Sequence, residues 1–87
     1  MYVILVYDIN QKRVGKACKH LRQYLNWVQN SVFEGEITKG KYQEAIAGLK
    51  EIIKKSEDSV LVYKVRTENA MKKVVIGIEK NPVETFL

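Results

Sequence analysis

The chain opens on an uninterrupted apolar run, residues 2–7, which ends at a polar turn that begins with Asp8. β-branched and aromatic residues dominate this run, and such a composition is typical of a β-strand. Because the run does not alternate between apolar and polar residues, both faces of the predicted strand should be buried. The pattern therefore places this strand in the middle of a sheet that is covered on both sides.

Two segments change to the helical period, in which apolar residues recur every three or four positions. The first runs from about residue 12 to residue 25 and carries lysines on its opposite side, which predicts an amphipathic helix with a basic outer face. Asn10 precedes it as a candidate cap. The second follows Thr38, which is also a candidate cap. Its apolar face consists of Tyr42, Ala45, Ile46, Leu49, Ile52 and Ile53.

Four further segments have the composition of strands. They are residues 27–33, a short segment around Ile37, residues 60–65 and residues 73–78. The order is therefore β-α-β-β-α-β with one extra C-terminal strand, which is the plan of the ferredoxin-like α+β fold. The chain of 87 residues fits one domain, in which residues from about 79 to 87 form a C-terminal tail.

The apolar first strand also predicts an assembly. In a ferredoxin-like domain both helices cover one face of the sheet and leave the other face open. A strand that is apolar on both faces conflicts with this arrangement in a single chain. A second copy on the open face resolves the conflict, so we expect a homodimer with two-fold symmetry. The extra strand at residues 73–78 is expected to add to the edge of the partner's sheet.

The charge of the chain points to the kind of partner. Lys and Arg number 15 against 10 Asp and Glu, which gives a net charge of +5. Such a surplus on a small surface favours polyanions, although a merely solvated surface is the alternative. Residues 2–7 are too short to span a membrane and lack the features of a signal peptide, so no membrane association is expected. A single cysteine, Cys18, fits a reducing, cytoplasmic compartment.

Most familiar catalytic devices are missing from the sequence. The glycines are scattered and form no phosphate-binding loop. One histidine, His20, and one cysteine do not supply a zinc site. Nothing places a serine beside His20, so a Ser-His-Asp triad is not supported.

Asp8 stands out because it directly follows the buried strand. One interpretation is local, since aspartate and asparagine are good turn and capping residues. The other is a magnesium site, because proteins hold Mg²⁺ with one or two carboxylates, water and substrate phosphates. A two-fold axis near the strand end would bring two copies of Asp8 together, and one shared Mg²⁺ would relieve their repulsion. Asp8 is therefore the candidate catalytic and metal-binding residue, at a site where the ion would stabilise charge on a phosphodiester.

Basic and aromatic residues suggest where a nucleic acid would lie. Lysines of the first predicted helix neutralise phosphates without reading bases, or else form an ordinary solvated helix face. Arg13 and Arg22 are the stronger candidates, because a guanidinium grips a phosphate with two prongs. Trp27 and Tyr24 are assigned to packing rather than to base stacking, whereas the role of Phe33 at a predicted strand end stays open.

Three blocks of the sequence resemble the CRISPR-associated protein 2 family. They are residues 1–9, which end in Tyr-Asp-Ile, residues 21–35, which contain Gln-Asn-Ser-Val-Phe-Glu-Gly, and residues 77–82. The middle block is the most specific, and the three span the chain in order and at family length. The resemblance implies a ferredoxin-like homodimer that acts in spacer acquisition. There it bridges the CRISPR integrase, CRISPR-associated protein 1, and supports duplex DNA.

The resemblance also implies an activity and a site. Some members are described as metal-dependent nucleases that act on single-stranded RNA or double-stranded DNA. The family's metal-binding aspartate matches Asp8, with one Mg²⁺ shared between the two Asp8 residues of a dimer. Polar and basic residues near that site, and those of the family's other recurring block, contribute the candidate nucleic-acid contacts. These are Asn10, Lys12, Arg13, Lys16, Arg22, Ser31 and Phe33.

Three classes of function are thus to be distinguished. A magnesium-dependent endonuclease has a thin catalytic set, with one candidate carboxylate per chain and no clear general base. A non-catalytic scaffold that positions duplex DNA for the integrase needs only charge, shape and symmetry. A regulatory domain for a small ligand is disfavoured by the basic surplus, and it would require binding that ignores salt.

Overall fold

The elements of the chain follow the predicted order. In the computed structural model, which describes residues 1–80 and leaves residues 81–87 of the predicted tail outside, the β-strands form one antiparallel sheet in the order β2-β3-β1-β4. Its elements are β1 (Tyr2–Asp8), α1 (Gln11–Leu21), β2 (Asn26–Gln29), β3 (Val32–Glu36), α2 (Lys39–Ile52), β4 (Ser59–Val65) and a 3-10 turn (Glu68–Ala70). The mixed α+β, ferredoxin-like plan is confirmed, with β1 inside the sheet.

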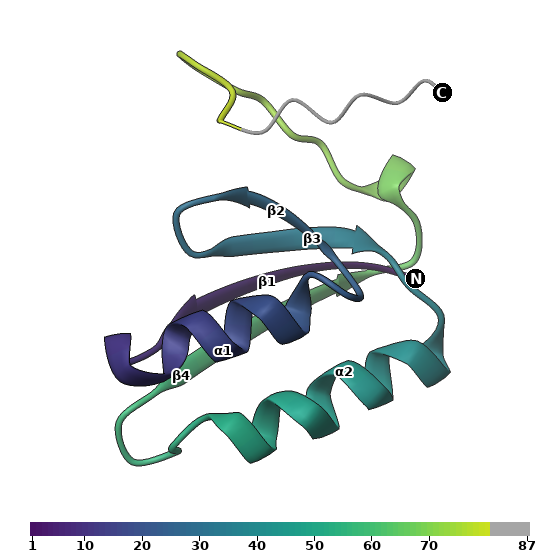
Figure 1. The fold of residues 1–87 in the computed structure, drawn as a ribbon. Helices are drawn as coiled ribbons and strands as arrows, with labels where there is room; N and C mark the ends of the chain where they lie inside the picture. Colours follow the sequence, from purple (N-terminus) through teal and green to yellow (C-terminus); the bar gives the residue numbers. More distant parts are fainter. Residues whose placement is uncertain (81–87) are drawn as a thin grey trace.

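Both helices cover one face of the sheet (Figure 1). On that face Val3 and Leu5 of β1 and Phe33 of β3 are buried in one hydrophobic cluster with Leu21 of α1 and Leu49 of α2. The helical period of the sequence therefore correctly predicted which face of each helix joins the core.

Neither helix among residues 1–80 combines the length and the apolar character that crossing a bilayer requires.

The two helices come close together at Gly48 of α2. The ring of His20 on α1 lies where a β-carbon at this position would be, so a larger residue would displace the ring. Nε2 of His20 lies 2.9 Å from the backbone oxygen of Ala45. His20 is therefore a helix-packing residue and not a free surface group.

Three element boundaries differ from the prediction. The short strand expected around Ile37 lies earlier in the chain, because β3 ends at Glu36 and Ile37 follows it. The segment expected as one strand, residues 27–33, is divided by a turn at Asn30 and Ser31 into β2 and the start of β3. Asn30 has φ of 42°, a left-handed conformation that asparagine tolerates. The residues on both sides of this turn favour β-strands, so the composition of the segment does not indicate the turn. The first helix ends at Leu21 and not at Leu25, because residues 22–24 form turns.

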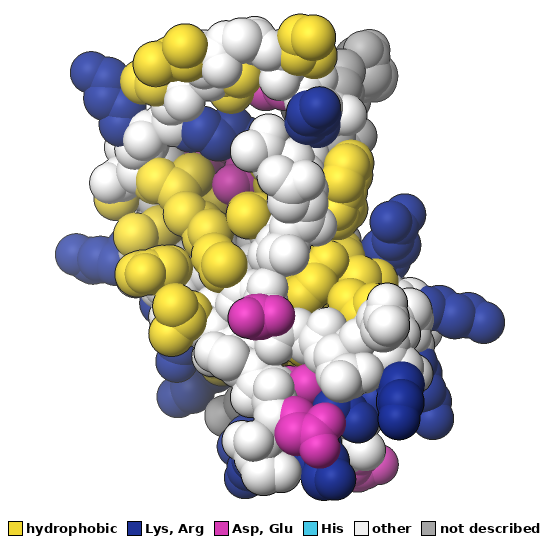
Figure 2. Space-filling view, turned by 90° about the vertical axis from the view of Figure 1, so that its left-hand side faces the viewer, with side chains coloured by type: hydrophobic (Ala, Val, Ile, Leu, Met, Phe, Trp, Pro, Cys, Tyr) yellow, Lys and Arg dark blue, Asp and Glu magenta, His cyan; other side chains and the backbone are white. Residues whose placement is uncertain are grey.

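The face of the sheet opposite the helices carries no helix, and residues 73–78 cover only part of it. We call it the open face; Ile4 and Val6 of β1 lie on it beside Tyr63 and Leu61 of β4. Tyr63 is 58% exposed and Leu61 is 55% exposed. Figure 2 shows hydrophobic side chains gathered over the upper half of the molecule and charged ones crowded at its lower end. The apolar pattern on both sides of β1 thus leaves a surface that no helix covers.

The extra strand predicted at residues 73–78 is absent from the sheet of the described chain. The segment runs on the side of the sheet opposite the helices and pairs with none of β1 to β4 (Figure 1). Its apolar side chains are exposed, and Ile76 reaches 93%. Within the single chain the segment has no ladder partner for its amides, and its addition to the sheet of a partner stays a prediction.

One ionic contact fixes the start of this segment to the open face. Lys73 Nζ lies 2.8 Å from Oε2 of Glu34, and the Tyr2 hydroxyl donates to the same oxygen at 3.0 Å. Burial, followed by the hydrogen bond to Glu34, raises the pKa of Tyr2. The phenol therefore stays a donor, and the contact holds Lys73 beside β3.

Candidate functional site

Asp8 lies at the end of β1 and is exposed. Alternation along the strand places it on the same side as Ile4 and Val6, at the border of the open face. Ser59 of β4 is its partner across the ladder. Asp8 therefore stands beside the start of β4 at one end of the open face.

Tyr7 holds the turn between β2 and β3 next to Asp8. Its backbone amide donates to the Ser31 oxygen at 3.0 Å, and its hydroxyl donates to the Asn30 oxygen at 3.1 Å. The hydroxyl also lies 3.1 Å from Sγ of Cys18. Burial above all raises the pKa of Tyr7 to about 12, so the phenol stays protonated at neutral pH. Ser31 is half-buried in the turn that Tyr7 fixes.

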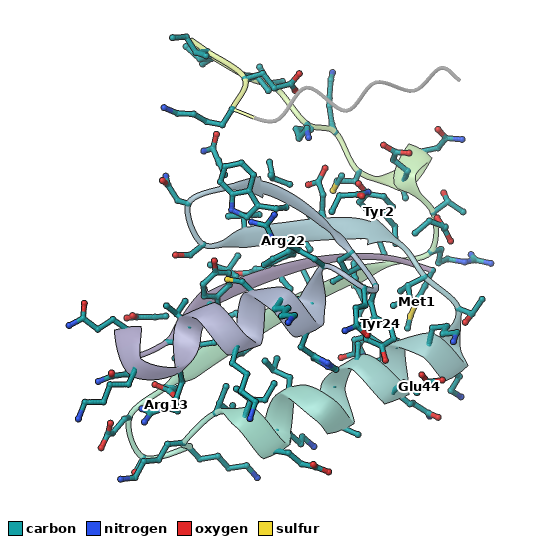
Figure 3. The ribbon with its side chains drawn as sticks, viewed as in Figure 1. Met1, Tyr2, Arg13, Arg22, Tyr24 and Glu44 are labelled. Carbon is teal, nitrogen blue, oxygen red and sulfur yellow. The ribbon has the colours of Figure 1, made fainter. Side chains whose placement is uncertain are left out.

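Trp27 and Tyr24 take part in packing, as expected. Trp27 packs against the hydrophobic cluster, and its Nε1 donates to the Asn30 oxygen at 3.1 Å. The Tyr24 hydroxyl points toward Glu44 of α2 (Figure 3) and donates to it at 3.2 Å. Both contacts favour a structural role for these two rings over base stacking.

Phe33 is not available as a base-stacking surface. Its side chain is 0% exposed, and its ring centroid lies 5.9 Å from that of Tyr7. The prediction that Phe33 contacts nucleic acid is therefore corrected. The error follows from the hidden turn, because Phe33 lies inside β3, on the face that the helices cover, and not at the end of a strand.

Arg13 is occupied by acidic partners. Its Nε lies 2.7 Å from Oδ2 of Asp58, and its Nη2 lies 2.9 Å from Oε1 of Glu57. This engagement corrects the interpretation of Arg13 as a free two-pronged phosphate ligand. Sequence reasoning did not single out Asp58.

The remaining candidates are spread along α1. The Asn10 side chain accepts from the Lys12 amide at 2.9 Å, which confirms its role as the helix cap. Lys12, Lys16 and Arg22 are exposed. Figure 3 shows Arg13 near the start of α1 and the side chain of Arg22 between α1 and the sheet. The candidate set therefore forms an extended basic surface, and the structure does not gather it around Asp8.

The ion pair between Arg13 and Asp58 sets the response to acid. The hydrogen bond from Arg13 is the main cause that holds the pKa of Asp58 well below its usual range, and the Asn10 and Lys54 amides add to it. Arg13 also lowers the pKa of Glu57. Since the folded state lowers both pKa values, the unfolded state binds more protons as the pH falls.

We therefore expect a loss of stability in acid that depends on this pair. The stabilisation from this pair is complete above about pH 4, the pKa of such carboxyl groups in the unfolded chain. It is lost as the pH falls below this value toward the lower pKa values that these groups have in the folded protein. Arg13→Gln should flatten the decline of the unfolding free energy between about pH 5 and pH 2. Urea unfolding at a series of pH values measures this, with Lys12→Gln as the control of equal charge change. Equal slopes in Arg13→Gln and wild type would contradict the expectation.

A metal ion would need ligands beyond one chain. Among residues 1–80 no three His, Cys, Asp or Glu side chains gather closely enough to hold a metal. Asp8 offers one exposed carboxylate with Ser59 across the ladder. This donor set suits an oxygen-seeking ion such as Mg²⁺ only when a second copy or a substrate phosphate completes it.

Comparison with known proteins decides the family. The model of the family described as CRISPR associated protein Cas2 matches residues 1–73. The chain belongs to the Cas2 family. A Cas2 relative from Thermococcus kodakarensis, named CRISPR-associated endoribonuclease Cas2, is 49% identical over 87 residues, which are 100% of both chains. The family resemblance of the sequence blocks is thereby confirmed.

Solved Cas2 structures share the fold. One crystal structure of Cas2 aligns with a TM-score of 0.86 at 47% identity and covers 100% of this chain and 98% of that one. The Cas2 structure of Streptococcus pyogenes aligns with a TM-score of 0.72 at 28% identity and covers 86% and 100%. The ferredoxin-like arrangement of this chain is therefore the Cas2 fold.

Proposed function

We propose that the chain is a homodimeric, nucleic-acid-binding Cas2 protein of spacer acquisition, with a metal-dependent endonuclease site at Asp8. The observation that carries the proposal is the place of Asp8, exposed at the border of the open face. A second copy packed on this face would bring two Asp8 carboxylates toward one two-fold axis.

Two unsatisfied features of the single chain support the dimer. Leu61 and Tyr63 expose apolar surface on the open face, and exposed patches of this kind mark interaction sites. The outer edge of β4 carries no neighbouring strand among the described residues, while residues 73–78 form no ladder of their own. The segment of one protomer is suited to add to the β4 edge of the other.

The site would hold one Mg²⁺ between the two Asp8 residues. When bound, the ion supplies a polarised water and neutralises charge on a phosphodiester. The exposed Lys12, Lys16 and Arg22 would neutralise further phosphates along the bound nucleic acid. The name of the Thermococcus kodakarensis relative, an endoribonuclease, favours RNA as the substrate that is cut, and we propose single-stranded RNA, with duplex DNA as the other candidate.

A non-catalytic scaffold is the second candidate function. The observation that favours it is the single carboxylate at the site, since residues 1–80 contain no cluster of further acidic or histidine groups around Asp8. A basic dimer needs no such cluster to support duplex DNA and to bridge the integrase, CRISPR-associated protein 1. For both candidate functions we propose a cytoplasmic location, where the protein would encounter the nucleic acids and the integrase.

One experiment on the wild-type protein separates the two. Labelled single-stranded RNA and duplex DNA are incubated with the protein in Mg²⁺ or in chelator, and duplex binding is measured at increasing salt. Cleavage that requires Mg²⁺ is expected, together with sedimentation as a dimer at micromolar concentration. Salt-sensitive binding without cleavage would leave the scaffold as the function. A monomer in sedimentation would overturn the dimer and the shared site.

A further inference from the structure

The carboxylate of Asp58 joins three parts of the chain at the end of the sheet where Asp8 lies. Its side chain is 0% exposed. Oδ1 accepts from the Asn10 amide at 2.9 Å and from Arg13 Nη2 at 3.1 Å. Oδ2 accepts from Arg13 Nε at 2.7 Å and from the Lys54 amide at 2.8 Å. Because each oxygen accepts two hydrogen bonds, the carboxylate has one fixed orientation.

Two links lead from Asp58 to Asp8, one through the Asn10 amide and one through the next residue of the chain, Ser59. Asn10 follows Asp8 by two residues, so its bond to Asp58 fixes the chain immediately after Asp8. Ser59 follows Asp58 in sequence and pairs with Asp8 across the β1–β4 ladder. A single buried carboxylate therefore holds both the turn after Asp8 and the strand beside it.

Stability alone is a weak explanation for this group. Removing an ion pair from water often costs as much as the attraction returns, and apolar residues of similar volume can stabilise a fold equally well. An apolar residue cannot accept the amide of Asn10, however, and so cannot set the direction of the turn. A site that holds an ion or a phosphate needs its ligands fixed to within about 0.5 Å. To hold an ion or a phosphate, Asp8 therefore requires a rigid turn after it.

We propose that Asp58 is a positioning residue for Asp8, which acts through the Asn10 amide and through Ser59 without touching substrate. The inference rests on the proposed role of Asp8 and extends it to a residue outside the exposed site. It also gives Arg13 a function, because its guanidinium saturates and orients the Asp58 carboxylate.

The test compares Asp58→Asn with Glu57→Gln. Both variants remove one negative charge beside Arg13. Asparagine at position 58 keeps only one of the two acceptor oxygens, so it cannot accept the Asn10 and Lys54 amides together, whereas Glu57 accepts neither amide. The probe is Mn²⁺, titrated into the protein and followed by paramagnetic broadening of the Asp8 amide resonance. Asp58→Asn should weaken Mn²⁺ binding by about 10–100-fold, as loss of a supporting partner does at metal sites. It should also lower kcat for cleavage at unchanged KM, while Glu57→Gln changes neither quantity.

Asp58→Asn with a lowered Tm but unaltered Mn²⁺ affinity and kcat would overturn the proposal, because Asp58 would then only stabilise the fold. Hydrogen exchange in the wild-type protein covers the case in which this variant does not fold. The Asn10 amide should exchange slowly, and exchange at the rate of an unstructured peptide would equally overturn the proposal.

The same measurements separate this proposal from the proposed function. If wild-type protein binds no Mn²⁺ at Asp8, the metal site fails as a function. The Asp8 and Asn10 amide shifts in metal-free Asp58→Asn then decide the positioning role. Shifts confined to the α2–β4 loop would contradict it, and shifts at both amides would support it.

Discussion

Asp8→Asn is expected to lose metal-dependent cleavage by about 100-fold or more, because even supporting partners of metal ligands contribute 10–100-fold. The amide keeps the shape of the side chain but removes the charge that would bind Mg²⁺. Duplex binding should stay intact or become stronger, since one negative charge is removed from a basic surface. Cleavage assays with Mg²⁺ and with chelator, run beside binding at several salt concentrations, measure both effects.

Glu51→Gln is the matched control for this experiment. Glu51 is an exposed carboxylate on α2, so its replacement changes the net charge equally without touching the end of β1. Both exposed substitutions should leave the unfolding free energy within about 0.5 kcal/mol of wild type. Full cleavage by Asp8→Asn would show that Asp8 is only a turn residue.

Phe33→Ala is expected to lower the unfolding free energy by about 3–5 kcal/mol, the usual loss for removing a buried aromatic ring. The ring is fully buried in the cluster between the sheet and the helices. Domains are stable by only about 5–15 kcal/mol, so this loss takes a large part of the total. Urea unfolding at one fixed protein concentration measures it, because the proposed dimer would make stability depend on concentration.

Phe33→Leu distinguishes packing from recognition of bases. Leucine keeps most of the apolar contacts and should cost roughly 1 kcal/mol, but it removes the aromatic face. A folded Phe33→Leu protein should bind RNA and DNA as wild type does. Weaker binding by this variant at wild-type stability would restore the base-stacking interpretation of Phe33.

The sequence predicted the features that depend on neighbouring residues. The continuous apolar run gave β1 its interior position, and the helical period gave the buried faces of α1 and α2. Asn10 and Thr38 were predicted as caps from residue type, and both cap helices in the structure. Asp8 at the strand end was located in the same way.

The features that were missed depend on distant partners. Asp58 contacts Asn10 and Arg13, which lie 48 and 45 residues away in the chain, and no local pattern reports such a pairing. The turn at Asn30 is hidden because strand-forming residues continue on both sides of it. The segment at residues 73–78 has strand composition, but composition does not say which edge it will meet.

The uncovered outer edge of β4 has a consequence for the single chain. Unpaired amides and carbonyls beside an apolar surface invite β-strands from any neighbouring chain, which is how insoluble aggregates begin. A newly made chain would carry this hazard until a strand covers the edge. The lysine-rich exterior of α1 provides charge repulsion between chains in that interval, so the basic residues would protect solubility as well as bind phosphates.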